Sequence, residues 1–189
     1  TIHDKHDLKF SINKLLAGDT AIEKTGKALP DETLDAIKNS DVCLKAPVGE
    51  SAKDVIVFLR QSLDLFANIR PAKSYPNMPA LRDDIDLVIV RENTEDLYTG
   101  EEFEVDNAAV ALRKISERAS KRIAKYGFEM AKQRGQKKKV TCVHKSNVMK
   151  ITDGLFSQVC SDVAKNYSDI SFEQMYVDAC AMNLIRQPQ

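Results

Sequence analysis

The sequence predicts an α/β protein in which helices cover a layered sheet. Short apolar runs of strand length alternate with longer amphipathic segments, and this alternation continues along most of the chain. In addition, no glycine-rich fingerprint of the G-x-G-x-x-G or G-x-x-x-x-G-K-[ST] type follows a strand. The predicted fold is therefore an α/β/α arrangement that is neither a Rossmann fold nor a P-loop fold.

The first third of the chain predicts a helix, a strand and a second helix. Leu29-Pro30-Asp31 opens a helix with acidic residues in its first turn, and this helix ends near Ser40. Residues 41–45 then indicate a short strand, and residues 51–65 indicate the next helix.

Two further strands are expected at residues 67–74 and 87–91. Two prolines lie in the segment 75–79 between them, so this segment cannot pair regularly. The second strand passes directly into a polar stretch that runs from Arg91 to Tyr98. A buried strand that ends in so many polar side chains indicates a site at its end.

The rest of the chain predicts a long amphipathic helix followed by a strand, a helix, a short strand and a last helix. The long helix is expected because apolar residues recur at steps of three and four. The five elements are expected at residues 107–134, 140–144, 152–164, 170–172 and from Asp178 to near Pro188.

Composition excludes several classes of protein. The 189 residues carry 28 Lys and Arg against 28 Asp and Glu, so the net charge of zero does not favour nucleic acid or an anionic membrane as a partner. No apolar run approaches the roughly 20 residues needed to cross a bilayer. The widely spaced cysteines, which form no C-x-x-C pair, are interpreted as reduced core thiols of a cytoplasmic protein; they are Cys43, Cys142, Cys160 and Cys180.

Three arginines are candidates for binding a carboxylate substrate. Arg60 closes a predicted helix, while Arg70 and Arg91 lie in the two predicted strands. If they converge at one end of the sheet, their planar guanidinium groups are suited to a multiply charged carboxylate. The alternative is three separate surface ion pairs.

Tyr98, Lys145 and Asp178 are the other candidates for chemistry. Tyr98 and Lys145 both lie just beyond a predicted strand, where they are either proton-transfer groups or ordinary surface residues. Asp178 either caps the last helix or faces a divalent cation.

Four ordered stretches resemble the β-decarboxylating dehydrogenases, the family of isocitrate, homoisocitrate and 3-isopropylmalate dehydrogenases. The likeness covers nearly the whole chain and is greatest to isocitrate dehydrogenase. The stretches are Leu59 to Gln61 with Leu63 to Pro71, Val88 to Tyr98, Val143 to Lys150, and Tyr176 to Asp178.

The resemblance implies a role for each candidate residue. The substrate carboxylates would be bound by three arginines, which are Arg60, Arg70 and Arg91. Tyr98 would protonate the enol left by decarboxylation, and Lys145 would take the proton of the substrate hydroxyl as hydride passes to NAD or NADP. Asn147 would lie near both substrate and nicotinamide, and Asp178 would be one of the ligands of Mg²⁺ or Mn²⁺.

The resemblance also implies domains and a partner. Residues 1–66 would belong to the large, coenzyme-side domain, and residues 67–189 would form most of the small domain, with a dimerisation arm that begins near residues 100–106. In the implied homodimer, Lys145 and Asp178 act in the site of the partner subunit. Because this family has longer chains, the 189 residues are expected to be the central portion of a larger enzyme.

The substrate is predicted to be isocitrate, with homoisocitrate and 3-isopropylmalate as alternatives and a noncatalytic regulatory subunit as a further one. Glu95-Asp96 favours isocitrate, because isopropylmalate enzymes tend to have glycine and apolar residues there. Asp54 argues against it, since this position of many isocitrate dehydrogenases carries a serine that meets the third carboxylate. The choice between NAD and NADP cannot be made from this sequence.

Overall fold

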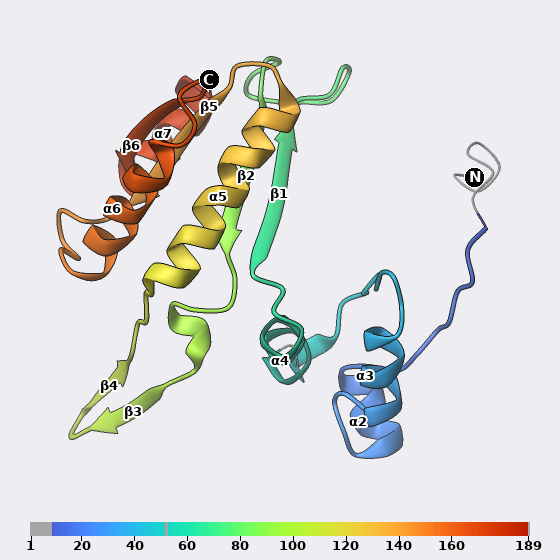
Figure 1. The fold of residues 1–189 in the computed structure, drawn as a ribbon. Coiled ribbons are helices and arrows are strands. Elements are labelled where there is room, and N and C mark those ends of the chain that lie inside the picture. Colours follow the sequence, from blue (N-terminus) through green and yellow to red (C-terminus); the bar gives the residue numbers. More distant parts are fainter. Residues whose placement is uncertain (1–8, 52, 189) are drawn as a thin grey trace. The chain divides into compact units, whose positions relative to one another are not determined.

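The computed structural model describes residues 9–51 and 53–188 (Figure 1). The chain forms two compact units, with the boundary between Leu63 and Asp64. The side chains of Lys53 and Asp54 lie outside the described part, and so does any contact of Asp54 with a substrate. The assignment of residues 1–66 and 67–189 to coenzyme-side and small domains stays a prediction.

The described part of the first unit contains three short α-helices. A single carboxylate ties two of its segments together: Asp19 accepts hydrogen bonds from the backbone N–H of Glu50 at 3.0 Å and from the N–H and hydroxyl of Ser51 at 3.0 and 2.7 Å. The predicted helix after Pro30 is confirmed. The elements are α2 (Asp19–Thr25), α3 (Asp31–Lys38), the 3-10 turn η1 (Gly49–Ser51), the π-helical turn η2 (Lys53–Val57) and α4 (Phe58–Ser62).

Three sequence predictions in this unit are wrong. Residues 41–45 form no strand, because no other strand in the described part of the chain pairs with them, and Leu44 is 99% exposed. Cys43 is consequently exposed rather than a core thiol. The helix predicted over 51–65 is broken into η2 and α4, and α4 ends at Ser62.

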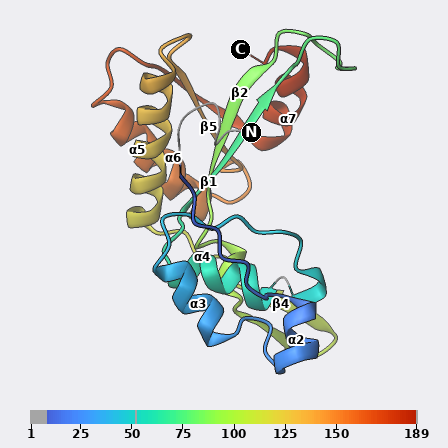
Figure 2. The same cartoon turned by 90° about the vertical axis from the view of Figure 1, so that its right-hand side faces the viewer.

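The second unit begins with an antiparallel pair of strands. β1 (Ala67–Lys73) pairs with β2 (Asp86–Glu92), and Asn68 lies opposite Arg91 in the register. Alternate residues of a strand point to opposite faces. One face of this pair packs against α5 (Glu117–Arg134), which runs beside the two strands in Figure 1 and Figure 2. On the other face Arg70, Ile89 and Arg91 are exposed.

The long helix begins later than the sequence predicts. Residues 102–111 form a β-hairpin of β3 (Glu102–Val105) and β4 (Ala108–Ala111), and α5 starts only after Ser116. Ser116 is the N-cap of α5 and accepts a hydrogen bond from the N–H of Ala119 at 3.1 Å. This cap determines where the helix begins.

The remaining elements form a parallel β-α-β unit and a final helix. They are β5 (Lys139–His144), α6 (Thr152–Ala164), β6 (Ser171–Tyr176) and α7 (Val177–Arg186). The predicted α6 is confirmed, while β6 is longer than predicted. α5 and α6 pack against the Cys142 face of this sheet, and α7 contacts the opposite face, where Asn183 approaches Met175.

The core of the second unit lies between α5, α6 and β5. Phe128 is fully buried there and stacks on Tyr167 with ring centroids 4.8 Å apart. Cys142 and Cys160 belong to this core, as predicted, and Cys180 is partly buried. Among the described residues, no helix is long and apolar enough to span a membrane.

Candidate functional site

The exposed face of β1 and β2 brings Arg70 and Arg91 together. Asn68 lies directly opposite Arg91, and Arg70 lies opposite Ile89, so all four side chains emerge on the same face. The Nε atom of Arg70 donates to Asn68 Oδ1 at 3.3 Å. The amide of Asn68 donates in turn to Asn93 Oδ1 at 3.3 Å, and Asn93 is only 5% exposed. Arg70 is thus held by the partly buried Asn68, which is held in turn by the buried Asn93.

Neither Arg70 nor Arg91 forms an ion pair with a carboxylate in the part of the chain that the structure describes. Two guanidinium groups on one face without a neutralising acid favour the binding of an anion, and each offers a planar fork of donors that matches a carboxylate. For these two residues, the alternative of separate surface ion pairs is therefore not supported.

Tyr98 contacts the same cluster through its ring. It lies in the 3-10 turn η3 (Leu97–Thr99), and the Cζ atom of Arg91 lies 5.2 Å from the centroid of its ring. This distance is in the range of a cation–π interaction. Arg91 and Tyr98, two of the candidate residues, thus lie in contact within one unit.

The geometry differs from the sequence prediction in one respect. We expected the arginines to meet at the carboxyl ends of neighbouring strands, but β1 and β2 are antiparallel, so their carboxyl ends lie at opposite ends of the pair. Arg70 and Arg91 are instead diagonal neighbours across the two strands. Arg60 lies in α4 of the first unit, and its convergence with Arg70 and Arg91 stays a prediction.

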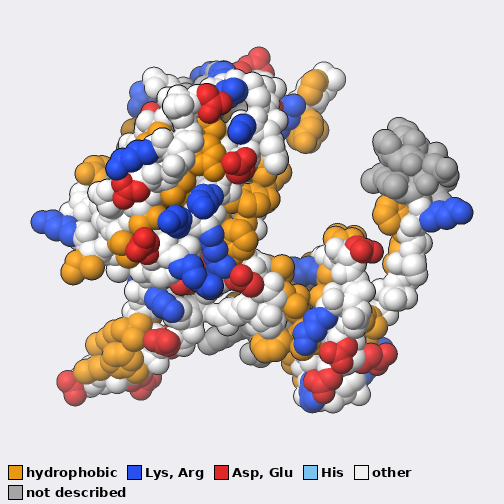
Figure 3. Space-filling view, in the orientation of Figure 1, with side chains coloured by type: hydrophobic (Ala, Val, Ile, Leu, Met, Phe, Trp, Pro, Cys, Tyr) orange, Lys and Arg blue, Asp and Glu red, His pale blue; other side chains and the backbone are white. Residues whose placement is uncertain are grey.

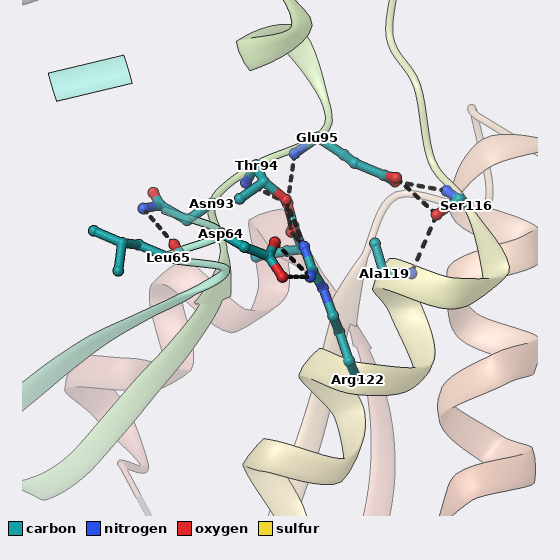
Figure 4. A network of polar contacts seen from close by, with 9 residues as sticks. Asp64, Leu65, Asn93, Thr94, Glu95, Ser116, Ala119 and Arg122 are labelled. Carbon is teal, nitrogen blue, oxygen red and sulfur yellow. Dashed lines mark hydrogen bonds and ion pairs between the residues drawn. The ribbon is translucent and has the colours of Figure 1, made fainter. Parts of the chain in front are cut away.

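A polar network holds the loop between Arg91 and Tyr98 on α5 (Figure 4). Arg122 of α5 donates through Nη1 to both carboxylate oxygens of Asp64, at 2.7 and 2.8 Å. Its Nη2 atom donates to the hydroxyl of Thr94 at 2.7 Å and to Glu92 Oε1 at 3.3 Å. The side chain also stacks on Phe66, with Cζ 4.5 Å from the ring centroid.

Glu92 and Glu95 serve this loop as acceptors. Glu92 points to the face opposite Arg91 and accepts the N–H groups of Thr94 and Glu95, both at 2.8 Å, and the Thr94 hydroxyl at 2.7 Å. Glu95 accepts the N–H and hydroxyl of Ser116 at 2.9 and 2.8 Å. The polar residues after the strand therefore form a scaffold that positions Arg91 and Tyr98.

Burial raises the pKa of Glu92, but the hydrogen bonds from Thr94, from the N–H of Glu95 and from Arg122 outweigh it and hold this pKa below its ordinary value. The unfolded state therefore binds the proton more tightly than the folded state. The resulting stabilisation is fully present above the ordinary glutamate pKa of about 4.3 and is lost as the pH falls through the lower pKa of the folded state.

We expect Glu92→Gln to lower the free energy of unfolding at pH 7 by about 1–2 kcal/mol, because the variant loses the charge that these donors stabilise. The difference from wild type should shrink as the pH falls below about 4. Urea unfolding at pH 7 and pH 3 measures this, with Glu104→Gln on the exposed β3 strand as a control that changes little. An undiminished difference at pH 3 would exclude the carboxylate as its cause.

Lys145 and Asp178 form a second cluster at the carboxyl edge of the parallel sheet. His144 and Tyr176 are the last paired residues of β5 and β6, so the residues that follow them leave the sheet side by side. Lys145 Nζ lies 2.5 Å from Asp178 Oδ1. The hydrogen bond from Lys145 is the main reason that the pKa of Asp178 lies below its ordinary value.

Asn147 lies in the turn between β5 and α6 and is exposed. Its predicted position near substrate and nicotinamide stays a prediction. The turn itself is anchored by His144, whose Nδ1 atom accepts the N–H of Ser146 at 3.2 Å and whose Nε2 atom lies 3.0 Å from Gln174 Oε1.

The described residues do not form a metal site by themselves. No group of three or more His, Cys, Asp or Glu side chains within them is arranged to hold a metal ion. Asp178 fits as one ligand, since its carboxylate is largely exposed and oxygen is the donor that Mg²⁺ and Mn²⁺ prefer. It is not the N-cap of α7, a position held by Tyr176.

Several residues that support the site were not singled out from the sequence. Asn68 was detectable, because it stands two positions before Arg70 in a strand and must share its face. Arg113, Arg122 and Asp153 had no sequence signal, since their partners lie far away along the chain.

The second unit carries two arginines on one strand pair and a tyrosine in the turn η3 beyond it, an arrangement suited to binding an organic acid. Similarity to known proteins shows which family the chain belongs to. The chain matches the isocitrate/isopropylmalate dehydrogenase family over residues 1–189. It is 51% identical to 3-isopropylmalate dehydrogenase of Saccharolobus solfataricus over 186 residues, which cover 98% of this chain and 54% of the relative.

Two further similarities concern isocitrate dehydrogenases. The chain is 43% identical to the mitochondrial isocitrate dehydrogenase [NAD] regulatory subunit 2 of Arabidopsis thaliana, covering 86% of this chain and 46% of the relative. It also superposes on the crystal structure of isocitrate dehydrogenase from Methylococcus capsulatus with a TM-score of 0.89 at 41% identity, covering 100% of this chain and 58% of the other.

The protein belongs to the isocitrate/isopropylmalate dehydrogenase family, as the resemblance predicted. The chain spans about half the length of the curated relatives it matches.

Proposed function

We propose that the protein is an NAD(P)-dependent β-decarboxylating dehydrogenase that acts on 3-isopropylmalate. The observation that carries this proposal is the exposed pair Arg70 and Arg91, without carboxylate partners among the described residues and with Tyr98 against Arg91. The choice of substrate is supported by relatives at 50% identity or more that are named 3-isopropylmalate dehydrogenase. This replaces isocitrate, which the sequence favoured.

The contacts of Glu95 and Asp96 do not require isocitrate as the substrate. Glu95 and Asp96 were taken to favour it, yet both carboxylates are engaged within the protein: Glu95 binds Ser116, and Asp96 binds Arg113 with Oδ1 2.6 Å from Nε. Carboxylates that are hydrogen-bonded within the protein do not indicate which substrate is bound. Their presence is equally compatible with 3-isopropylmalate.

In the proposed reaction, Arg70 and Arg91 bind the substrate carboxylates, with Arg60 as a third donor. Lys145 would take the proton of the C2 hydroxyl, and Asn147 would lie near substrate and nicotinamide; the coenzyme, when bound, would accept the hydride of C2. The bond to the β-carboxylate then breaks and CO₂ leaves. Tyr98 donates a proton to the carbon of the enol that remains.

Asp178 is proposed to contribute one ligand to Mg²⁺ or Mn²⁺, with the other ligands supplied from outside the described residues. When bound, such a cation polarises the substrate oxygen. Lys145 lies 2.5 Å from Asp178, so the proposed base and the proposed metal ligand are neighbours.

We further propose a homodimer in which Lys145 and Asp178 serve the site of the partner subunit. The β3–β4 hairpin supports this proposal, because it exposes Phe103, Val105 and Val110, and hydrophobic side chains cover it in Figure 3. An exposed apolar patch on an isolated pair of strands is typical of an interaction surface. This hairpin begins where the dimerisation arm was expected.

An absorbance assay at 340 nm on the full-length protein tests the proposal. With Mg²⁺ present, 3-isopropylmalate, isocitrate and homoisocitrate are each supplied with NAD and with NADP. We expect the highest kcat/KM with 3-isopropylmalate, whereas preferred turnover of isocitrate would support the second candidate, which the likeness to the Methylococcus capsulatus structure favours. Turnover of none of them would favour a regulatory subunit, as in the Arabidopsis thaliana relatives.

A further inference from the structure

Arg113 connects the two segments that carry the proposed catalytic residues. It lies just before α5 and donates to Asp96 through Nε at 2.6 Å and through Nη2 at 3.3 Å. Its Nη1 atom binds Asp153 Oδ1 and lies 2.9 Å from the sulfur of Met149. A single guanidinium group thus reaches the loop of Tyr98 on one side and the helix that follows Lys145 on the other.

The Asp96 end of this bridge governs the turn that carries Tyr98. Asp96 is the N-cap of η3 and has φ 65° and ψ −140°, a backbone conformation that residues other than glycine seldom adopt. The carboxylate of Asp96 is held by Arg113, and the backbone N–H of Asp96 donates to the carbonyl of Lys114 at 2.9 Å. Strained backbone of this kind persists only where the surroundings enforce it.

The Asp153 end governs the backbone of Lys145. Asp153 lies in the first turn of α6 and is 4% exposed. One carboxylate oxygen binds Arg113, and the other accepts the N–H of Lys145 at 2.5 Å. A buried carboxylate with two such partners has little freedom to move. Because Arg113 fixes Asp153 and Asp153 holds the N–H of Lys145, the position of Arg113 determines where the turn at Lys145 begins.

We propose that Arg113 is a positioning residue that places Tyr98 through Asp96 and Lys145 through Asp153, a role that rests on the proposed function of those two residues. Arg113 itself touches no reacting atom. Because Tyr98 serves its own site and Lys145 that of the partner subunit in the proposed homodimer, one arginine sets the geometry of two sites.

Arg113→Lys in the full-length protein tests this role. Lysine keeps the charge but cannot hold Asp96 and Asp153 with a planar fork. Two partial reactions are measured with the 2-oxo acid that dehydrogenation would form: its decarboxylation, by release of CO₂, and its reduction by the reduced coenzyme at 340 nm. We expect kcat to fall by about tenfold or more in both, since small misplacements of a catalytic group are costly, while KM for the substrate stays within about twofold.

Arg134→Lys is the matched control. Arg134 also pairs with an aspartate, Asp86, at 2.5 Å, and the exposures of the two side chains, 31% and 34%, are close to the 28% and 35% of Arg113 and Asp96. This pair lies at the other end of α5 and β2, away from η3. We expect both partial reactions to keep their wild-type rates in this variant.

A second variant separates the two arms of the bridge. Asp96→Asn tolerates positive φ but removes the charge, so it should slow decarboxylation and leave reduction unchanged. In a Tyr98→Phe background, Arg113→Lys should cause no further loss of decarboxylation.

Wild-type rates in Arg113→Lys, or loss in only one of its partial reactions, would overturn the role of Arg113. An inactive wild type would instead overturn the proposed function.

Discussion

Tyr98→Phe is expected to lower the rate of decarboxylation by about 10²–10⁴-fold, the usual contribution of a positioned general acid. The change removes only the hydroxyl. The ring that lies 5.2 Å from Arg91 Cζ remains, so the cation–π contact and the turn η3 are preserved. The measurement is CO₂ release from the 2-oxo acid supplied to the full-length protein.

Reduction of the same 2-oxo acid by the reduced coenzyme is the internal control for Tyr98→Phe. This reaction uses Lys145 and needs no proton on the enol carbon, so its rate should remain near that of wild type. Equal losses in the two reactions would show that the hydroxyl of Tyr98 supports binding or folding rather than protonation.

Arg91→Gln is expected to lower kcat/KM for 3-isopropylmalate by roughly 10²–10³-fold, which corresponds to about 3–4 kcal/mol. The glutamine cannot supply the charged fork that a carboxylate requires. Steady-state kinetics on the full-length protein measures this loss, which should appear mainly in KM if Arg91 binds substrate and transition state alike.

Arg118→Gln is the matched control for Arg91→Gln, because Arg118 is an exposed arginine in the first turn of α5, away from the exposed face of β1 and β2. It should leave kcat/KM within about twofold of wild type. If the two variants behave alike, the anion is bound elsewhere.

The elements predicted well are those whose pattern is local. The helix at Thr152–Ala164 has both an apolar period and clear ends, and the strands at Ala67–Lys73 and Asp86–Glu92 have apolar runs bounded by turn residues. Residues 41–45 have the same strand-like pattern, but a strand also needs a partner, and no local pattern shows whether one is present. The start of α5 was misplaced because Leu112 continues the helical apolar spacing although the cap lies at Ser116.

The candidate site could be predicted only in part for a similar reason. Arg91 and Tyr98 lie in one continuous stretch, so their proximity follows from seven residues of chain. The network that supports them does not, because Arg122 reaches Asp64 across 58 positions and Arg113 reaches Asp153 across 40. Such contacts depend on how α5 packs against the β1–β2 pair and the β5–β6 pair.

The most direct test of the account is a crystal structure of the full-length protein with 3-isopropylmalate. We predict carboxylate oxygens within about 3.2 Å of guanidinium nitrogens of both Arg70 and Arg91, the distance of a hydrogen bond, and the phenolic oxygen of Tyr98 facing the carbon that becomes protonated. A substrate bound away from the face shared by these three side chains would contradict the account.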